Sequence, residues 1–356
     1  MKKIAVVGIV GLPARYGGFE TLVENLVKYS SQEIEYSVFC SKKSYSTLND
    51  KHGKAKLYYI SFDANGMSSI IYDFVAMIKS CFLKVDVILI LGVSGCCFLP
   101  LIRFFTKAKI VTNIDGLEWK RDKWSKVAKL FLKLSEKFAV KYSDVVITDN
   151  QGITEYVKSE YAIVSNTIAY GGDHALVGMD NSEVLLSNSE KKSYALSLCR
   201  IEPENNIALI LESFSKSKEH LKFIGNWNSS EYGIGLKNKY SNFENIEIID
   251  PIYNLEKLFI LRKNCSYYVH GHSAGGTNPS LVEMMHFGKP ILAFDCVFNR
   301  YTTENKATYF NSSSDLLSLL DNNDNSSLLK VGKEMKLIAV ARYSWSIIAR
   351  KYEVLF

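Results

Sequence analysis

Short apolar runs alternate with longer amphipathic segments along almost the whole chain of 356 residues. Runs of this kind are typical of parallel strands, which helices cover on both faces of a sheet. After the first run, residues 21–29 place Leu22, Leu26 and Tyr29 on one face of a helix. This alternation predicts an α/β fold built on doubly wound parallel sheets.

The strand-like runs fall into two series, which the polar and aperiodic residues 178–192 separate as a linker would. A chain of this length exceeds the usual size of a single core. We therefore expect two Rossmann-like domains facing a cleft, over residues 1–177 and 190–339, with ligands at the carboxyl ends of the strands. The first series comprises residues 4–7, 36–39, 57–60, 85–91, 110–113 and 145–148, and the second comprises residues 194–198, 221–224, 246–249, 267–269 and 290–294.

The composition excludes several other classes of protein. Apolar residues make up 47% and charged residues 22% of the chain, as in a globular protein rather than a disordered one. The seven cysteines form no Cys-x-x-Cys pair, which favours neither a disulfide framework nor a zinc site and fits a reducing cytoplasm. We expect no signal peptide, and the apolar uncharged run at residues 87–102 is shorter than a bilayer requires.

Two candidate binding segments follow strands of the first series. Residues 8–20 carry Gly17 and Gly18 directly before a helix start, where backbone N–H groups can contact an anion. Residues 113–121 carry Asp115, Glu118 and Trp119, which suit sugar hydroxyls and stacking on a sugar ring. The alternatives are an ordinary loop between a strand and a helix for the first segment, and a helix cap or a solvated charge for the second.

A third segment follows the first strand of the second series and contains Arg200. An arginine at this place can hold a diphosphate through its fork of donors, or it can form a surface salt bridge. His270 and His272 lie near the same edge, but no carboxylate or cysteine stands at metal-ligand spacing from them. Because the chain also has no Asp-x-Asp motif, we expect no metal and an activity independent of metal.

The fourth segment, residues 271–283, combines glycines with a helix start at Asn278-Pro279-Ser280. We expect the open N–H groups of Ser280 and Leu281 to face outward with the positive end of the helix dipole, as a seat for a diphosphate. Glu283 lies in the first turn, within reach of a ribose hydroxyl beside that diphosphate. The alternative is a connection between strand and helix with ordinary capping.

These segments resemble the motifs of GT-B glycosyltransferases of family 4 and, within them, a bacterial rhamnosyltransferase group. The resemblance covers nearly the whole chain. It implies a GT-B architecture in which a C-terminal helix, here at about residues 340–356, crosses back to the first domain. The matching segments are residues 11–21 (GLPARYGGFET), 115–121 (DGLEWKR), 200–204 (RIEPE), 275–283 (GGTNPSLVE) and 343–349 (YSWSIIA).

The resemblance also implies roles for individual residues. Glu283 matches the second glutamate of the family's E-x7-E motif, which binds the donor ribose, and Arg200 matches an arginine that contacts the donor diphosphate. Asp115 stands where the family commonly has a histidine, so we expect this third catalytic candidate to accept a hydrogen bond or to orient the sugar. The other donor-side candidates are Gly17, Gly18, Asn205, Gly276, Thr277, Asn278, Ser280 and Leu281, and the acceptor-side candidates are Arg15, Tyr16, Glu118 and Trp119.

Two further departures from the family's pattern affect the donor site. Gly275 stands where the first glutamate of the E-x7-E motif is expected, so the backbone around Gly276 and Thr277 must take over its contacts with the donor sugar. Asn205 stands where a lysine often follows the arginine motif, which removes one cation from the diphosphate site.

The predicted function is a retaining transfer of a hexose, with L-rhamnose favoured, from a nucleotide diphosphate sugar such as dTDP-rhamnose to a glycan acceptor. We expect the acceptor to be lipid-linked, in the synthesis of a bacterial surface polysaccharide, and we expect no cofactor and no nucleic-acid partner. One alternative is an NAD(P)-dependent oxidoreductase, although residues 8–20 do not form its G-x-G-x-x-G fingerprint. The other is a non-catalytic nucleotide-sugar-binding partner, which the glycine at position 275 would suit.

A lysine-rich segment predicts docking on an anionic membrane surface, at the cytoplasmic face. Residues 1–170 hold 23 Lys and Arg against 16 Asp and Glu, so the positive charge of the chain is concentrated there. Lysines recur along one helical face, which anionic lipids would attract, and the alternative is a solvated lysine face. We expect the neighbouring apolar stripe of Val127, Phe131, Leu134 and Phe138 to pack on the domain core. The lysines are Lys126, Lys129, Lys133, Lys137 and Lys141.

Overall fold

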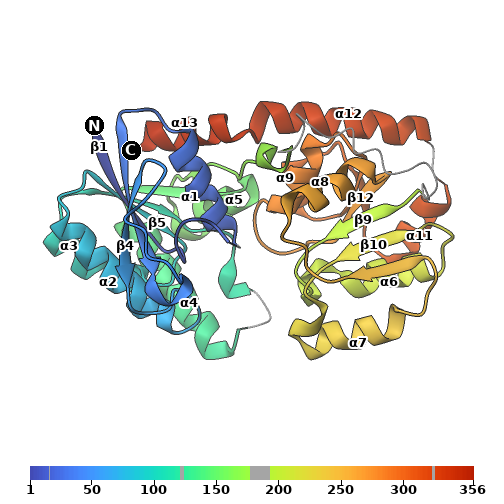
Figure 1. Cartoon of the computed structure of the whole chain (residues 1–356), viewed down its shortest axis with the longest axis horizontal. Coiled ribbons are helices and arrows are strands. Elements are labelled where there is room, and N and C mark those ends of the chain that lie inside the picture. The colour runs from blue at the N-terminus through green and yellow to red at the C-terminus, as the bar shows by residue number, and fades with distance from the viewer. Residues whose placement is uncertain (16, 121–123, 177–192, 323–324) are drawn as a thin grey trace. The chain divides into compact units, whose positions relative to one another are not determined.

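The computed structural model describes residues 1–15, 17–120, 124–176, 193–322 and 325–356 (Figure 1). The chain forms two compact units, of which the first comprises Met1–Tyr170 with Trp345–Phe356 and the second comprises Gly171–Ser344. The predicted linker, residues 178–192, lies outside the described residues. Each unit contains a sheet of parallel strands, so the predicted α/β fold with two Rossmann-like domains is confirmed.

The sheet of the first unit has the strand order β3-β4-β2-β1-β5-β6-β7-β8. All of its pairings are parallel except that of β3 with β4. The order reverses at β1, which lies between β2 and β5, and the carboxyl ends of β1 and β5 therefore flank a switch point where ligands bind in such sheets. The strands are β1 (Lys2–Val7), β2 (Ile34–Ser41), β3 (Lys51–His52), β4 (Ala55–Ile60), β5 (Val87–Leu91), β6 (Lys109–Asn113), β7 (Val145–Thr148) and β8 (Asn166–Thr167).

Helices flank this sheet, and the last of them comes from the C-terminus. Helix α13 (Trp345–Leu355) belongs to the first unit, where the Tyr352 hydroxyl accepts a hydrogen bond of 2.7 Å from the Asn113 amide of β6. The predicted return of a C-terminal helix to the first domain is confirmed. The other helices of the unit are α1 (Gly18–Tyr29), α2 (Ser68–Phe82), α3 (Leu99–Phe105), α4 (Lys126–Tyr142) and α5 (Gln151–Tyr161), with 3-10 turns η1 (Lys42–Ser44), η2 (Cys96–Phe98) and η3 (Glu118–Lys120).

The sheet of the second unit has the strand order β11-β10-β9-β12-β13-β14, with parallel pairing throughout. Its switch point lies between β9 and β12, because β9 is the first strand of the unit and has neighbours on both sides. Buried aromatic residues fill the core below, where Phe223 and Trp227 pack edge to face with ring centroids 5.1 Å apart. The strands are β9 (Ala195–Leu198), β10 (Leu221–Ile224), β11 (Ile246–Ile249), β12 (Tyr267–His270), β13 (Ile291–Phe294) and β14 (Thr308–Phe310).

Seven α-helices of the second unit lie within the described residues and connect or cover these strands. They are α6 (Ile207–Ser215), α7 (Glu231–Tyr240), α8 (Leu255–Asn264), α9 (Pro279–His286), α10 (Val297–Thr302), α11 (Ser313–Asp321) and α12 (Asn325–Arg342), with 3-10 turns η4 (Asp173–Leu176), η5 (Pro203–Asn205) and η6 (Trp227–Ser229).

Helix α4 is oriented differently from the sequence-based expectation. The predicted core-facing stripe is wrong, since Val127 is 80% exposed and Leu134 is 49% exposed, while Phe131 and Phe138 are half-buried. The buried face instead contains two polar residues that form hydrogen bonds, which hydrophobic periodicity does not register. Its members are Leu132, Ser135, Glu136, Ala139 and Val140.

Candidate active site

The loops after β9 and β12 are joined to each other at the switch point of the second unit. The Asn206 amide donates a hydrogen bond of 2.8 Å to the Gly271 carbonyl, and the Ser273 N–H donates one of 2.9 Å to the Glu204 carbonyl. The two backbones approach so closely that a Cβ at position 271 would lie 2.1 Å from the Asn205 carbonyl oxygen. The structure therefore brings together the two donor-side segments that were found separately in the sequence.

Asn205 and Arg200 have different surroundings in this loop pair. Asn205 is buried, and its amide donates to the Arg200 carbonyl at 2.7 Å while its oxygen lies 2.7 Å from Nδ1 of His272. The nitrogen and the oxygen of the Asn205 amide are thus both used within the protein, to join the loops after β9 and β12. The Arg200 side chain is exposed at the carboxyl end of β9, and its Nε lies 3.8 Å from a Glu202 carboxylate oxygen.

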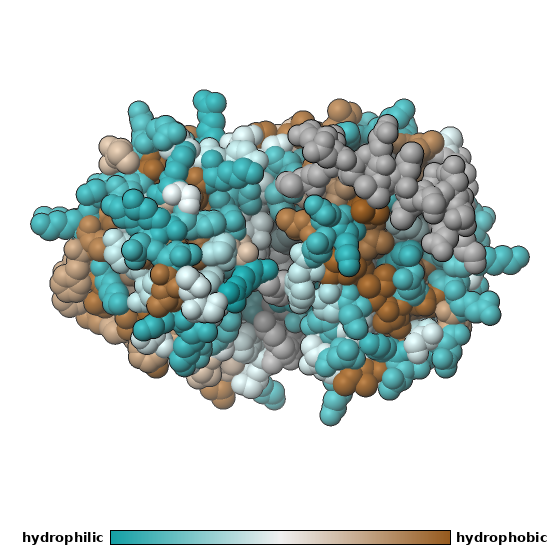
Figure 2. Space-filling model, in the orientation of Figure 1, coloured by the Kyte–Doolittle hydropathy of each residue, from teal (hydrophilic) through white to brown (hydrophobic). Residues whose placement is uncertain are grey.

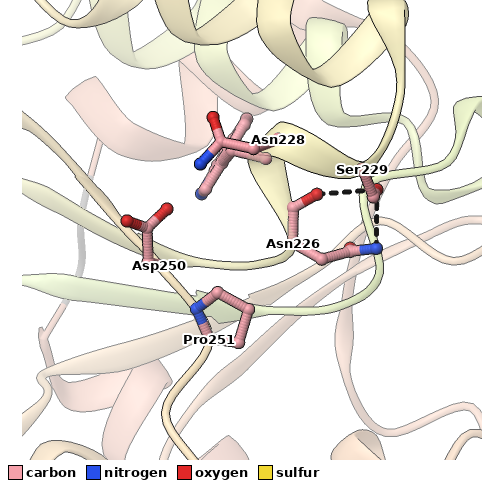
Figure 3. Close-up of a pocket in the computed structure, with 6 residues that line it drawn as sticks. Asn226, Asn228, Ser229, Asp250 and Pro251 are labelled. Carbon is pink, nitrogen blue, oxygen red and sulfur yellow. Dashed lines mark hydrogen bonds between the residues drawn. The ribbon is translucent and has the colours of Figure 1, made fainter.

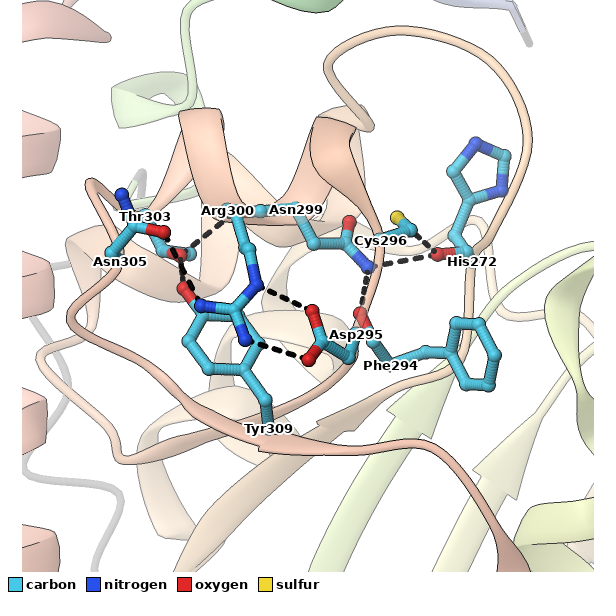
Figure 4. Close-up of polar contacts among 9 residues, drawn as sticks. All are labelled: His272, Phe294, Asp295, Cys296, Asn299, Arg300, Thr303, Asn305 and Tyr309. Carbon is cyan, nitrogen blue, oxygen red and sulfur yellow. Dashed lines mark hydrogen bonds and ion pairs between the residues drawn. The ribbon is translucent and has the colours of Figure 1, made fainter.

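Helix α10 fixes the loop after β12 from the other side (Figure 4). The buried Asn299 amide donates hydrogen bonds of 2.8 Å to the carbonyls of His272 and Phe294, and it thereby links the loops after β12 and β13. The Arg300 guanidinium forms a bidentate ion pair with the Asp295 carboxylate, in which Nε contacts Oδ1 and Nη2 lies 2.6 Å from Oδ2. The loop that begins at Gly271 is therefore preorganised rather than open to rearrangement.

The glycine at position 275 is required by the backbone. Its φ of 122° belongs to a region that side chains rarely adopt, and a Cβ there would lie 3.1 Å from Nε2 of His272. A glutamate at this position would be strained, so the departure from the E-x7-E motif is built into the loop. Beside it Thr277 is buried, with 4% of its surface exposed.

The start of α9 corrects one expectation. The Asn278 side chain caps this helix, since its oxygen accepts hydrogen bonds from the Ser280 N–H at 3.0 Å and from the Ser280 hydroxyl at 2.8 Å. The Leu281 N–H donates to the Asn278 carbonyl at 3.1 Å, and Leu281 is fully buried. The N–H groups of Ser280 and Leu281 are therefore not open, because asparagine satisfies helix N-termini in the way a bound anion would.

Glu283 points between an arginine and a histidine of the second unit. One carboxylate oxygen forms an ion pair with the Arg262 guanidinium of α8, and the other lies 3.2 Å from Nε2 of His174 in η4. Only 14% of the Glu283 side chain is exposed. Burial raises the pKa of Glu283, but Arg262 and His174 outweigh it and hold this pKa below its ordinary value. Glu283 is consequently a fixed carboxylate at neutral pH.

Sequence reasoning missed both partners of Glu283. Arg262 is 4% exposed, and its buried Nε has no hydrogen-bond partner among the residues that the structure describes. His174 approaches because Gly172 packs against α9, where a Cβ on Gly172 would lie 2.7 Å from the Val282 carbonyl oxygen. Neither residue belongs to a local motif, and only the paired glycines 171 and 172 in the sequence could have indicated a close approach of backbones.

In the first unit, the glycine loop after β1 is shaped around a buried carboxylate. Gly17 has a φ of 139°, and a Cβ there would lie 1.9 Å from a Glu20 carboxylate oxygen, so only glycine fits. Glu20 accepts a hydrogen bond of 2.8 Å from the Val10 N–H, and Gly18 begins α1. Arg15 is exposed and stacks over the Tyr45 ring at 4.9 Å, whereas Tyr16 lies outside the described residues.

The loop after β6 carries the other first-unit candidates. Asp115 adopts a left-handed φ of 63°, and its N–H donates to the Asn113 side-chain oxygen at 2.9 Å. The Glu118 carboxylate accepts a hydrogen bond of 3.0 Å from Trp124. Trp119 donates its indole N–H to Glu136 at 3.1 Å. These contacts hold the loop in one conformation but leave its sugar-binding role as a prediction.

Glu136 on α4 is the anchor of this loop. It is 1% exposed and accepts hydrogen bonds from the hydroxyls of Tyr156 at 2.6 Å and Tyr161 at 2.5 Å, in addition to the one from Trp119. Lys133 lies 3.4 Å from the same carboxylate and 4.6 Å from the centre of the Trp119 ring. Lys133 therefore belongs to this cluster and not to a free lysine face.

A small pocket of about 190 Å³ lies at the carboxyl ends of β10 and β11 (Figure 3). It is lined by residues that follow these two neighbouring strands, with Asn226 bonded to Ser229 on one side and Asp250 with Pro251 on the other. The pocket thus shares the sheet edge of the donor-side loops. Among the residues that the structure describes, no group of three or more histidine, cysteine or acidic side chains is arranged to hold a metal ion.

Comparison with protein families assigns both halves of the chain. Residues 1–173 match a model described as a domain of unknown function (DUF1972), and residues 181–314 match the model of glycosyl transferases group 1. Residues 181–314 are thus similar to the glycosyl transferases of group 1. The matched residues include Arg200, the loop after β12 and Glu283. No curated protein matches the chain.

Solved structures confirm the GT-B fold. Sucrose-phosphate synthase from Thermosynechococcus elongatus matches with a TM-score of 0.78 and 15% identity, over 100% of this chain and 98% of that one. HepE from Anabaena, in complex with UDP and glucose, matches with a TM-score of 0.76 and 13% identity, over 100% and 99%. Trehalose 6-phosphate synthase from Burkholderia multivorans matches with a TM-score of 0.71 and 10% identity, over 99% and 95%.

Proposed function

We propose that this glycosyltransferase transfers a hexose, with retention of configuration, from a nucleoside diphosphate sugar to a lipid-linked glycan acceptor in the synthesis of a bacterial surface polysaccharide. L-Rhamnose from dTDP-rhamnose is the favoured donor sugar. The enzyme would work at the cytoplasmic face of an anionic membrane, where such an acceptor is held.

The observation that carries this proposal is the environment of Glu283. Its carboxylate is fixed by Arg262 and His174, and the residue lies just after the first turn of α9 rather than within it as the sequence predicted, inside the glycosyl transferases group 1 match. A fixed and charged carboxylate of this kind can accept hydrogen bonds from the hydroxyl groups of a nucleotide sugar. Arg200 lies at the same sheet edge, exposed, where its guanidinium can neutralise a diphosphate.

In the proposed reaction, the leaving diphosphate oxygen helps to deprotonate the incoming hydroxyl. Arg200 stabilises the negative charge that develops on this oxygen, and Glu283 orients the nucleoside. The preorganised backbone at Gly276 and Thr277 would contact the donor sugar, because the glycine at position 275 leaves no carboxylate to do so. Asp115 would orient the acceptor or the sugar by accepting a hydrogen bond.

Two neighbours suggest which donors to test first. HepE is bound to UDP and glucose in one structure and to UDP-glucose in another. UDP-glucose is therefore the main competitor of dTDP-rhamnose as donor. Of the earlier alternatives, the NAD(P)-dependent oxidoreductase has no specific feature of the described residues in its favour, and the non-catalytic nucleotide-sugar-binding partner has only the glycine at position 275.

Calorimetric titration with dTDP, UDP and NAD tests the proposal at its first step. We expect one of the two nucleoside diphosphates to bind and NAD not to bind; binding of NAD alone would overturn the proposal. A panel of nucleotide sugars with a lipid-linked acceptor extract, analysed by mass spectrometry, then tests the transfer. A mass increase of one deoxyhexose with dTDP-rhamnose as the supplied donor supports rhamnose, whereas binding without transfer from any donor points to the non-catalytic partner.

A further inference from the structure

Two neighbouring helices of the first unit expose large apolar side chains. On α3, Leu101 is 44% exposed, Phe104 86% and Phe105 57%, and on α4 Leu130 is 73% exposed. We use the name docking face for six exposed residues of these helices, which are Leu101, Phe104 and Phe105 of α3 and Val127, Leu130 and Leu134 of α4.

The two helices are held together by hydrogen bonds on their buried sides. The Arg103 guanidinium of α3 donates hydrogen bonds of 2.8 and 2.6 Å to the Tyr142 carbonyl at the end of α4. The Cys97 N–H, just before α3, donates one of 3.0 Å to the Ser135 hydroxyl of α4. In Figure 2, apolar side chains gather along the left edge of the first unit, where Figure 1 places α2 and α3.

Exposed lysines border these apolar side chains on α4. Lys126, Lys137 and Lys141 are exposed on the same helix as Val127, Leu130 and Leu134. The one acidic residue within α4 is Glu136, and it is buried under Tyr156, Tyr161 and Trp119. The outer surface of α4 is therefore apolar and basic with no acidic group.

This combination differs from that of an ordinary surface helix. Apolar side chains scattered singly on a surface need no partner, whereas a group of them marks an interaction site, and the core of a protein–protein interface is depleted in lysine. Apolar side chains among lysines match an anionic lipid surface, where the apolar groups enter the boundary between headgroups and acyl chains and the lysines meet the phosphates.

We propose that the docking face inserts into the surface of an anionic lipid bilayer, with Phe104, Phe105 and Leu130 as the inserted side chains. This inference deepens the proposed function, on which it rests, because a lipid-linked acceptor lies at that same surface. It also changes the sequence-based idea, since apolar insertion joins charge attraction and Lys133 takes no part. Among the described residues no helix is both long and apolar enough to span a bilayer, so the contact we propose is a surface contact.

Co-sedimentation of the whole protein with vesicles tests this inference. Vesicles of phosphatidylcholine alone are compared with vesicles of phosphatidylcholine and phosphatidylglycerol. One variant combines Phe104→Ser, Phe105→Ser and Leu130→Ser, and a second combines Lys126→Gln, Lys137→Gln and Lys141→Gln. The matched control replaces exposed residues of α12 in the second unit, as Leu329→Ser with Leu337→Ser and as Lys330→Gln, Lys333→Gln and Lys336→Gln.

We expect the protein to bind the anionic vesicles and both docking-face variants to bind at least about tenfold more weakly, with the α12 controls unchanged. Added salt should weaken the binding of the wild type to anionic vesicles more than that of the lysine variant, because this variant has already lost its charge attraction. Equal binding to both kinds of vesicle, unchanged binding of the serine variant, or an equal loss in the α12 controls would overturn the inference. So would concentration-dependent dimerisation that the serine variant abolishes, because the face would then bind a second copy.

Nucleotide titration of the same variants separates this inference from the proposed function. The docking face lies outside the donor-side loops, so each variant should bind nucleoside diphosphate as the wild type does. Vesicle binding by a protein that binds no nucleotide would leave the inference standing and remove the function on which we based it.

Discussion

Glu136 in the first unit and Glu283 in the second are both held by side chains of their own unit, but in different ways. Glu136 is 1% exposed and binds donors from Trp119, Tyr156, Tyr161 and Lys133. Glu283 is half-buried and pairs with Arg262 through one oxygen and with His174 through the other.

This difference separates a structural carboxylate from one that can bind a ligand. Glu136 is enclosed by four donors of its own unit and fixes the loop that carries Trp119. Glu283 is held in place and kept charged by Arg262 and His174, and 14% of its side chain stays exposed, where a ligand can reach it. The comparison predicts that mutations around Glu283 change donor binding, whereas those around Glu136 change stability and loop position.

The largest effect is expected from Arg262→Met. Removing Arg262 leaves Glu283 with His174 as its remaining partner, and loss of one member of a buried ion pair costs about 3–5 kcal/mol. The variant should lose this amount of unfolding free energy, measured by urea denaturation, and its donor affinity with it. The double variant Arg262→Met with Glu283→Leu should recover most of the stability and none of the affinity. Losses that simply add in the double variant would show that the two residues act independently.

Glu283→Gln should reduce turnover and donor affinity by about ten- to a hundredfold, because a hydrogen bond to a charged group is worth about 1.5–3 kcal/mol. Steady-state kinetics and calorimetry measure both quantities. The matched control is Glu136→Gln, which should bind the donor as the wild type does. Normal kinetics of Glu283→Gln would remove the central residue from the proposed site.

The sequence predicts the strands well because their apolar runs are local signals. Every predicted strand is present, and only β3, β8 and β14 were missed, each being two or three residues long. The surroundings of Glu283 could not be predicted, since Arg262 and His174 are distant in sequence and become neighbours only through the packing of η4 and α8 on α9. The prediction of which face of α4 packs on the core was wrong, because Ser135 and Glu136 form hydrogen bonds on the buried face and an apolar pattern cannot reveal buried polar residues.

Glu136→Gln should itself cost about 1–3 kcal/mol of unfolding free energy, because the amide cannot accept all the hydrogen bonds that the carboxylate accepts. The expected signature is a lower melting temperature together with a changed fluorescence of Trp119, whose indole N–H it binds. The Michaelis constants of this variant test the role of the Trp119 loop. If the constant for the acceptor rises while that for the donor stays the same, the loop lies on the acceptor side. An unchanged melting temperature would show that Glu136 does not anchor the loop.

Arg200→Lys should weaken turnover more modestly, by about tenfold, since lysine keeps the charge and loses the bidentate fork. The exposed position of Arg200 predicts no change in melting temperature. If Arg200 forms only a surface salt bridge with Glu202, activity will be normal. Kinetics and melting of this one variant therefore decide between the two roles.

A pH-dependent effect is expected from another buried carboxyl group, Asp73 of α2. It lies beside Gly95 in the loop after β5, and burial raises its pKa to about 8, against a weaker opposing effect of the Gly95 N–H. A raised carboxyl pKa in the folded state means that the folded protein keeps a proton which the unfolded chain releases. Stability should therefore fall as pH rises from the ordinary carboxyl pKa toward 8.

Glu283 should affect the pH dependence of stability in the opposite direction, because its pKa is lowered in the folded protein. Its contribution to the unfolding free energy is present above the ordinary carboxyl pKa and is lost as the pH falls through the pKa of the folded state. Asp73→Asn should hence raise the melting temperature more at pH 8 than at pH 5, whereas Glu283→Gln should lower it at both and change the profile only in acid. Thermal melts of the wild type and both variants across this range measure the slopes. Parallel profiles for wild type and Asp73→Asn would show that this carboxyl group is already ionised in the folded protein, and the contrast would then rest on Glu136 and Glu283 alone.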